Sequence, residues 1–555
     1  MLFPWKQISL LLASVFLPWN CGGGSDEAAS VEGRLAPLLE NIGNLHHEVT
    51  TDSEMAQRFF DQGLSLYWGF NHAESARSFE EAARLDPNCA MAYWGQAVAL
   101  GPNINDPLAD PNRLKQAYEK SREALRLKGS GTEKEQALID ALAVRYAPDP
   151  AADRGPLNQA YADAMTQVNA KFGDDPDVAT LYAESVMDTM PWDYWTEDSQ
   201  PKPGVAQVLT ALETVMANHG EHPGANHLYI HAVEASNDPD RAVPSADKLG
   251  GLIPVAGHLV HMPSHIYIRV GRYADASQAN RDAILADEDY ISQCRAQGLY
   301  PIGYYPHNIH FLWAALAMEG RSEEATEAAR SVASKHTDDH LQMQGFGFGH
   351  LLRTIPLFSM VRFAQWDAIL AEPAPSPDLA FGNGIWHWAR GLAFANQGKA
   401  QEAGTELEQV RTIAADARLA QLDIFGGNTL DKMMAIAVEF LAGEIAAKQG
   451  NVQVAIGHLQ KAVELEDGLR YSEPPDWPLP PREWLGAALR EGGQPAEAER
   501  IYRENLNRHR DNGWGLFGLM RSLEAQGKTQ EAAEAKLRFD RAWANAEFPL
   551  TAESR

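Results

Sequence analysis

The chain has 555 residues, of which 45% are hydrophobic and 22% are charged, a composition typical of soluble proteins. Its 75 acidic residues outnumber the 47 lysines and arginines, which gives a net charge of −28. Because negative charge repels phosphate groups, this balance argues against nucleic acid or an anionic membrane as a partner. The length exceeds what one compact core usually serves, so we expect several domains or an array of repeats.

The N-terminal residues have the pattern of an export signal. Lys6 precedes an apolar run over residues 8–17, which is too short to span a bilayer as a mature helix. Cys21 and the Gly/Ser-rich stretch after it are typical of a lipidated N-terminus with a flexible tether. We therefore predict a signal peptide over 1–21, a tether over 22–45, and a protein of the periplasm or cell envelope whose membrane link is a lipid on Cys21. The alternative is simple secretion with cleavage nearby.

Glycine and alanine recur at a fixed spacing along the rest of the chain. Within 59–87, large, small and proline positions fall where a 34-residue helix–turn–helix repeat needs them. Further on, a glycine, four residues and then an alanine mark the turn between paired helices. This pattern occurs at Gly271/Ala276, Gly320/Ala325, Gly398/Ala403, Gly450/Ala455, Gly493/Ala498 and Gly527/Ala532, with Asn237/Ala242 and Phe363/Ala368 as variants.

So many matches at one spacing resemble the tetratricopeptide repeat family over most of 55–545. Glycine readily adopts the left-handed conformation that such a turn needs, and asparagine tolerates it. The resemblance implies an all-α fold, a right-handed α-solenoid of helix pairs, and it leaves function open because this scaffold serves many roles. We assign the chain to N-terminal helix pairs (46–200), central repeats (201–370), C-terminal repeats (371–545) and a tail (546–555).

Many of the 18 histidines stand 18, 15 or 11 positions before the turn alanines of four successive repeats. At about 100° per residue, these offsets fall in one stripe on the first helix of each pair. In tetratricopeptide proteins that helix lines the concave face, so the resemblance implies a shared groove wall. The stripe comprises His227, His231 and Glu234 before Ala242; His258, His261 and His265 before Ala276; His307 and His310 before Ala325; and His350 and Arg353 before Ala368.

The stripe has the residue types of a metal site. Neutral imidazole is the commonest metal ligand, and histidines at i and i+4, as in His227/His231 and His261/His265, can hold one ion from one helix face. A transition metal needs three or four protein ligands, so neighbouring helices must supply the rest. We predict a copper, iron or zinc site with these four histidines as the best ligands. The next candidates are His258, His307, His310 and Glu234, and together the set has enough donors for two ions.

Further polar residues lie where they could orient a ligand or bind a substrate. Asn226 and Asn308 adjoin histidines of the stripe, and Tyr229 and Tyr267 supply hydroxyl groups near it. Glu184 and Asp188 share a helix face just before an aromatic loop, and His350 and Arg353 complete this group. For each of these residues, and for any single histidine, a purely structural role is the alternative. A polar groove that conducts protons or binds substrate is a further alternative.

Several segments are similar to a family of large bacterial tetratricopeptide proteins. They are Phe60-Asp61-Gln62-Gly63-Leu64, Phe70-Asn71-His72, Gly101-Pro102-Asn103-Ile104-Asn105, Asn226-His227-Leu228-Tyr229-Ile230-His231, His261-Met262-Pro263-Ser264-His265-Ile266-Tyr267 and Glu473-Pro474-Pro475-Asp476-Trp477. The similarity runs nearly end to end. It implies the repeat fold and histidine blocks shared across the family, and it supplies no reaction.

Three functional hypotheses follow from the sequence. In the first, a metal ion with an open coordination position activates water or dioxygen, which would make the protein a metal-dependent hydrolase, oxidase or oxygenase acting on a small molecule. In the second, the protein is a non-enzymatic envelope scaffold whose groove binds a protein or peptide. The third is a metal store or delivery protein. Grooves that bind acidic peptides are rich in Lys, Arg and Asn, whereas this stripe is rich in histidine. The composition of the stripe therefore favours the metal-binding hypotheses.

Overall fold

The computed structural model describes residues 33–107, 110–196, 198–294, 300–342, 346–424 and 427–551. The predicted signal peptide, Cys21 and the first part of the predicted tether therefore lie outside the described residues, so export and lipidation stay predictions. The chain divides into two compact units. Unit 1 comprises residues 1–266 and 281–305, and unit 2 comprises residues 267–280 and 306–555.

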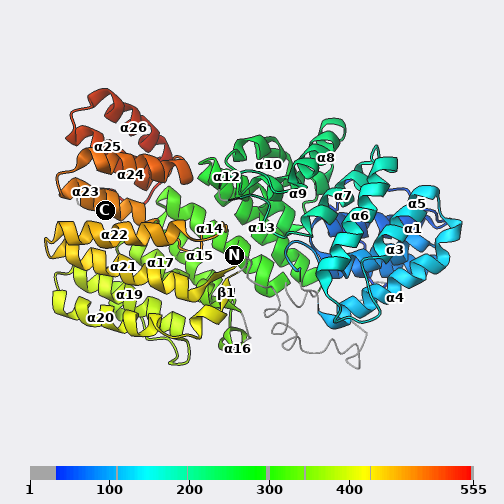
Figure 1. Ribbon diagram of the computed structural model, residues 1–555, viewed down its shortest axis with the longest axis horizontal. Helices are drawn as coiled ribbons and strands as arrows, with labels where there is room; N and C mark the ends of the chain where they lie inside the picture. The colour runs from blue at the N-terminus through cyan, green and yellow to red at the C-terminus, as the bar shows by residue number, and fades with distance from the viewer. Residues whose placement is uncertain are drawn as a thin grey trace. The chain divides into compact units, whose positions relative to one another are not determined.

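Unit 1 consists of helices that pack on their neighbours in the sequence (Figure 1). Short turns connect many of them, and side chains such as the Asp110 and Asp175 carboxylates cap their N-termini. Helix α12 passes from unit 1 into unit 2, α13 begins in unit 2 and ends in unit 1, and a π-helical turn over Tyr300–Tyr304 follows α13. The helices are α1 (Glu54–Trp68), α2 (His72–Leu85), α3 (Ala90–Ala99), α4 (Pro111–Leu127), α5 (Glu133–Ala143), α6 (Arg154–Phe172), α7 (Pro176–Met187), α8 (Val205–Asn218), α9 (Pro223–Val233), α10 (Val243–Leu249), α11 (Gly257–His261), α12 (Pro263–Arg269) and α13 (Tyr273–Cys294).

Unit 2 repeats the same construction. Its C-terminal half shows successive hairpins most clearly, from α19 to α26 in yellow to red in Figure 1. The two short strands β1 (Asp423–Ile424) and β2 (Asn428–Thr429) pair antiparallel between α20 and α21. The helices are α14 (Tyr305–Glu319), α15 (Ser322–Ser334), α16 (Asp338–Leu341), α17 (Gly347–Arg362), α18 (Trp366–Ala371), α19 (Ala380–Asn396), α20 (Ala400–Ala414), α21 (Leu430–Lys448), α22 (Val452–Asp467), α23 (Pro481–Glu491), α24 (Pro495–Arg508), α25 (Gly513–Ala525) and α26 (Thr529–Ala542).

The predicted fold class, an all-α solenoid of tetratricopeptide-type helix pairs, is confirmed, and the glycine–alanine pattern has its expected cause. The six turn glycines of the pattern have φ between 71° and 81°, in the left-handed region. The alanines that follow them are buried, and a small side chain there lets the two helices of a pair approach closely. The turn residues are Gly271, Gly320, Gly398, Gly450, Gly493 and Gly527.

The two variants of the pattern differ from the expectation. Asn237 is not among the described residues with positive φ, so the left-handed turn predicted there is wrong. The chain instead enters a 3₁₀ turn over Pro239–Ala242, where the proline ring fixes φ near −65°. In the other variant the left-handed residue is Ala364, with a φ of 51°, and not Phe363.

Proline also explains a break in the helix that carries three of the stripe histidines. Helix α11 ends at His261 and α12 begins at Pro263, because a proline can start a helix but lacks the N–H needed to continue one. The thiols of Cys89 and Cys294 are buried. In the part of the chain that the structure describes, no helix combines the length and the apolar character needed to cross a lipid bilayer.

Candidate metal centre

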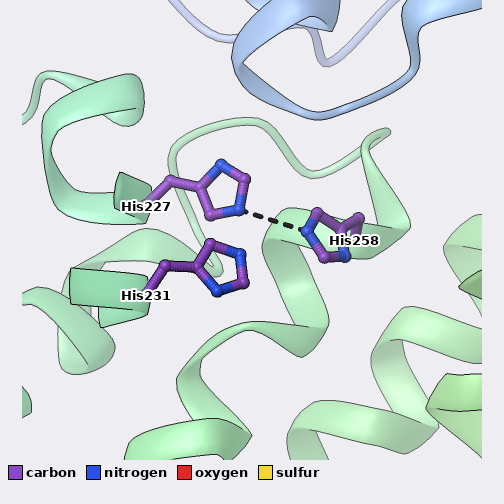
Figure 2. A group of neighbouring side chains, drawn as sticks. All are labelled: His227, His231 and His258. Atoms are coloured by element: carbon purple, nitrogen blue, oxygen red, sulfur yellow. Dashed lines mark hydrogen bonds between the residues drawn. The ribbon is translucent and has the colours of Figure 1, made fainter. Parts of the chain in front are cut away.

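Three histidine rings of unit 1 meet in its interior. His227 and His231 lie about one turn apart on α9 and face His258 on α11, as Figure 2 shows. Each ring offers a nitrogen, and the three nitrogens lie within 4.8 Å of one another. The exposed fractions of the three residues are 0, 1 and 2%. We call these residues the triad.

The contact of His227 with α1 defines which of its nitrogens is available. Its Nδ1 lies 2.7 Å from the main-chain oxygen of Trp68. Because a carbonyl oxygen only accepts, Nδ1 carries the proton and the lone pair of the neutral ring is on Nε2. That Nε2 lies 3.1 Å from Nε2 of His258, the contact drawn as a dashed line in Figure 2.

Glu234 orients two further rings in the same way. Its Oε1 accepts from Nδ1 of His231 over 2.8 Å, and its Oε2 accepts from Nδ1 of His265 over 2.5 Å. The glutamate is fully buried. Both rings therefore carry their protons on Nδ1 and present the lone pair of Nε2 away from the carboxylate. A carboxylate that holds the outer nitrogen of a histidine is the usual arrangement behind metal-ligating imidazoles.

A second pair of rings lies next to the triad. Nε2 of His261 and Nε2 of His265 are 2.9 Å apart, and the Ser264 hydroxyl lies 3.2 Å from Nδ1 of His261. The ring centroids of His231 and His265 are 5.8 Å apart, and those of His258 and His261 are 5.9 Å apart. Five histidines from α9, α11 and α12 therefore form one cluster in unit 1.

Burial keeps the rings of the triad neutral. It lowers the pKa of His231 to about 3, and it lowers those of His227 and His258 well below the ordinary value, with neighbouring histidines adding to the effect. Neutral imidazole is the form that binds metal, so no proton has to leave these rings near neutral pH.

One nitrogen of the cluster, Nε2 of His231, is a buried acceptor without a hydrogen-bond donor among the described residues. His227, His231 and His265 each carry the proton on Nδ1, which leaves only His258 and His261 able to donate from Nε2. An unpaired buried acceptor destabilises a fold, and a cation that binds several of these nitrogens would remove that penalty.

Aromatic side chains enclose the triad. The Phe70 ring lies nearly parallel to His258 at 5.3 Å and edge-on to His227 at 4.5 Å. Trp192 contacts His231 at 5.0 Å, and Tyr304 contacts His258 at 4.9 Å between ring centroids. The sequence predicts an open groove wall, whereas these histidines are buried. Phe70 and the Trp68 carbonyl were not predicted, because neither carries a metal-binding signal.

Within unit 2, the other stripe residues contact aromatic side chains and main-chain oxygens. His310 stacks on Trp313 at 5.7 Å, and burial lowers its pKa to about 3. His307 packs edge-on against Phe311 at 5.0 Å. Nε2 of His350 donates to the main-chain oxygen of Leu341 over 2.8 Å, and Arg353 donates to the main-chain oxygen of His336. The last two contacts fix the segment that precedes α17.

The supporting residues predicted in unit 1 bond elsewhere. Asn226 donates to the main-chain oxygen of His222 over 2.9 Å, within its own helix turn, and Tyr229 donates to Glu213 over 2.7 Å. Glu184 accepts from the Tyr67 hydroxyl over 2.6 Å, and burial raises the pKa of that glutamate. Asp188 accepts from Arg145 over 2.6 Å.

In unit 2, the two remaining predicted residues are both buried. The guanidinium of Arg272 lies over the ring of Tyr267, 4.2 Å from its centroid. Asn308 is fully buried on α14. Their predicted role in orienting a ligand or binding a substrate stays a prediction.

The fold and the site together define a helical-repeat protein with a buried histidine cluster. No protein-family model matches the chain, and no characterised protein matches its sequence. Among solved structures, the chain is similar to a human IFIT1 dimer with m7Gppp-AAAA, at 11% identity and a TM-score of 0.31 over 90% of this chain and 92% of that chain. It is also similar to a monomeric IFIT1 mutant with Gppp-AAAA, at 10% identity and a TM-score of 0.30 over 89% of this chain and 91% of that chain.

A third similar structure is Naa15/Naa10 bound to HypK-THB, at 10% identity and a TM-score of 0.24 over 89% of this chain and 90% of that chain. Likenesses of this degree carry no argument about function, and what those proteins bind is a property of those proteins. That this chain binds no nucleic acid stays a prediction from its charge.

Proposed function

We propose that the protein binds a transition-metal ion through Nε2 of His227, Nε2 of His231 and a ring nitrogen of His258. The observation that carries the proposal is the convergence of three buried neutral imidazoles, two of which are held in the required tautomer by Trp68 and Glu234. With metal–nitrogen bonds of about 2.0–2.1 Å, two ligand nitrogens lie about 2.8–3.4 Å apart for bond angles between 90° and the tetrahedral value. The 3.1 Å between His227 and His258 lies in that range.

Imidazole nitrogen restricts the choice of ion. Nitrogen donors suit zinc, copper and iron, whereas magnesium and calcium prefer oxygen donors. Three protein ligands leave a coordination position for another molecule, which is the arrangement of catalytic sites more than of structural ones. With Phe70, Trp192 and Tyr304 around the rings, a molecule of the size of water or dioxygen is the substrate or co-substrate that this position suits.

Elemental analysis of the purified full-length protein tests the proposal. After reconstitution with zinc, copper or iron, we expect at least one tightly bound ion per chain. The variant His227→Ala/His231→Ala/His258→Ala should bind about one ion fewer. The matched control His46→Ala/His387→Ala/His458→Ala removes three histidines that pair with carboxylates at or near the surface, and it should keep the wild-type content. A wild-type protein that is helical but takes up none of these metals would overturn the proposal. The alternative hypothesis, a scaffold that binds a protein or peptide, would then remain.

A further inference from the structure

We infer that the site is dinuclear, with a second ion bound by His261 and His265 beside the ion of the triad. This inference rests on the proposed function and deepens it. The two histidines come from consecutive short helices, α11 and α12, and the break at Pro263 separates them. Their Nε2 atoms are nevertheless 2.9 Å apart, at the lower end of the spacing of two ligands on one ion.

Glu234 links the two halves of the site. One carboxylate oxygen holds His231 of the triad, and the other holds His265 of the second pair. Each ring is thereby fixed with its Nε2 lone pair directed away from the same glutamate. A single side chain that orients one ligand in each half is an arrangement expected of two neighbouring ions, because a mononuclear site would need only one of the two contacts.

The spacing between the halves suits a pair of ions. Two-metal sites hold their ions about 3.5–4 Å apart. Across the two halves, His231 and His265 have ring centroids 5.8 Å apart, and His258 and His261 have centroids 5.9 Å apart. Rings at these distances from each other can bind adjacent ions. A ligand derived from solvent would then bridge the two ions.

The charge of the two ions restricts which metals could occupy the site. Glu234 is a buried carboxylate that accepts from two of these five rings. Neutral imidazoles do not offset the positive charge of two divalent ions, and uncompensated charge in a buried site is strongly unfavourable. A bridging anion such as hydroxide or ions of lower charge would reduce this charge, and copper offers the second route because it binds imidazole as Cu(I) as well as Cu(II).

Copper is the probe for the test. The full-length protein is loaded with Cu(II), freed of excess metal and measured by elemental analysis and by electron paramagnetic resonance with spin counting. We expect two copper ions per chain and far fewer than two spins, because a shared ligand couples them magnetically. The variant His261→Ala/His265→Ala should hold one copper ion with a full one-spin signal.

The outcomes separate this inference from the proposed function. One ion in the wild type and one in the variant would overturn the dinuclear site and leave the triad site intact. No bound copper in a folded wild type would overturn both. If the alanine variant does not fold, the wild-type stoichiometry and spin count decide alone: one ion with one full spin contradicts the inference, and two coupled ions support it.

Discussion

His227 donates its Nδ1–H to the main-chain oxygen of Trp68 over 2.7 Å, although 159 positions separate the two residues. Trp68 is the last residue of α1, and the final carbonyls of a helix have no acceptor role within it. His227 supplies the hydrogen-bond donor that this carbonyl lacks within its helix, and the carbonyl in turn fixes the tautomer of His227. The contact requires α9 to lie directly on the end of α1, which Gly224 at the start of α9 permits.

Replacing that glycine should separate the two helices. A Cβ at Gly224 would lie 2.4 Å from the ring of Trp68, which is closer than side chains pack. For Gly224→Ala we expect a loss of about 1–3 kcal/mol in the free energy of unfolding and metal binding weakened about tenfold, because His227 would lose its orienting carbonyl. Chemical denaturation of the apo-protein and competition with a chelator measure the two effects. Gly250→Ala is the matched control, since a Cβ there meets its nearest atom at 3.7 Å.

Glu234→Gln should weaken the metal site without changing its ligands. Glutamine keeps one oxygen acceptor but replaces the other by a donor, so it can hold only one of His231 and His265 with the proton on Nδ1. We expect a 10–100-fold loss of metal affinity, as is typical when the residue behind a ligand changes. The control Glu213→Gln alters a partly exposed glutamate that bonds to Tyr229. Equal affinities for the two variants would contradict this role of Glu234.

The parts of the fold and site that depend on local spacing could be predicted from the sequence. The turn glycines and buried alanines follow from a pattern six residues long, and the pairs His227/His231 and His261/His265 follow from the helical period. In each case the residues that determine the feature lie within one or two turns of each other. The exceptions also have local causes, since a proline ring replaced the left-handed turn expected at Asn237.

The enclosure of the site could not be predicted in this way. Phe70 and Trp192 contact the triad from segments far away in the sequence, and both have a positive φ that their residue types do not indicate. The number of positions between a histidine and the turn alanine predicts which face of the helix the histidine occupies. It does not predict which side chains pack on that face. His310 shares the offset of His227 and yet stacks on Trp313, so an equal offset does not give a histidine equal surroundings.

Phe70 should slow the exchange of the bound metal. Its ring covers His227 and His258, and leucine at the same position would fill less of that space. For Phe70→Leu we expect removal of the metal by a chelator to become about tenfold faster, as measured by stopped-flow or manual mixing with a coloured chelator. The control Phe60→Leu removes a fully buried ring of α1 that packs on Phe79. If the two variants release metal at the same rate, general destabilisation explains the faster release, and the position of the Phe70 ring over the histidines does not.

In unit 2, Asp476 should make stability depend on pH in the acidic range. The residue is 5% exposed, accepts from Nδ2 of Asn428 over 2.8 Å, and burial raises its pKa from 3.8 to about 7. Between these two values the folded protein keeps a proton that the unfolded chain has lost. The free energy of unfolding therefore falls as the pH rises from about 4 to about 7 and levels off above that, with a slope of at most about 1.4 kcal/mol per pH unit from this group.

Asp476→Asn removes this dependence while it preserves the shape of the side chain and an acceptor for Asn428. The difference in unfolding free energy between variant and wild type, measured by urea denaturation from pH 4.5 to 7.5, should shift steadily in favour of the variant as the pH rises. Asp416→Asn is the control. Its carboxylate lies beside Arg418 and has a lowered pKa, so a shift of the same sign in this window is not expected. A difference between Asp476→Asn and wild type that stays constant across the range would show that Asp476 titrates alike in the folded and unfolded states.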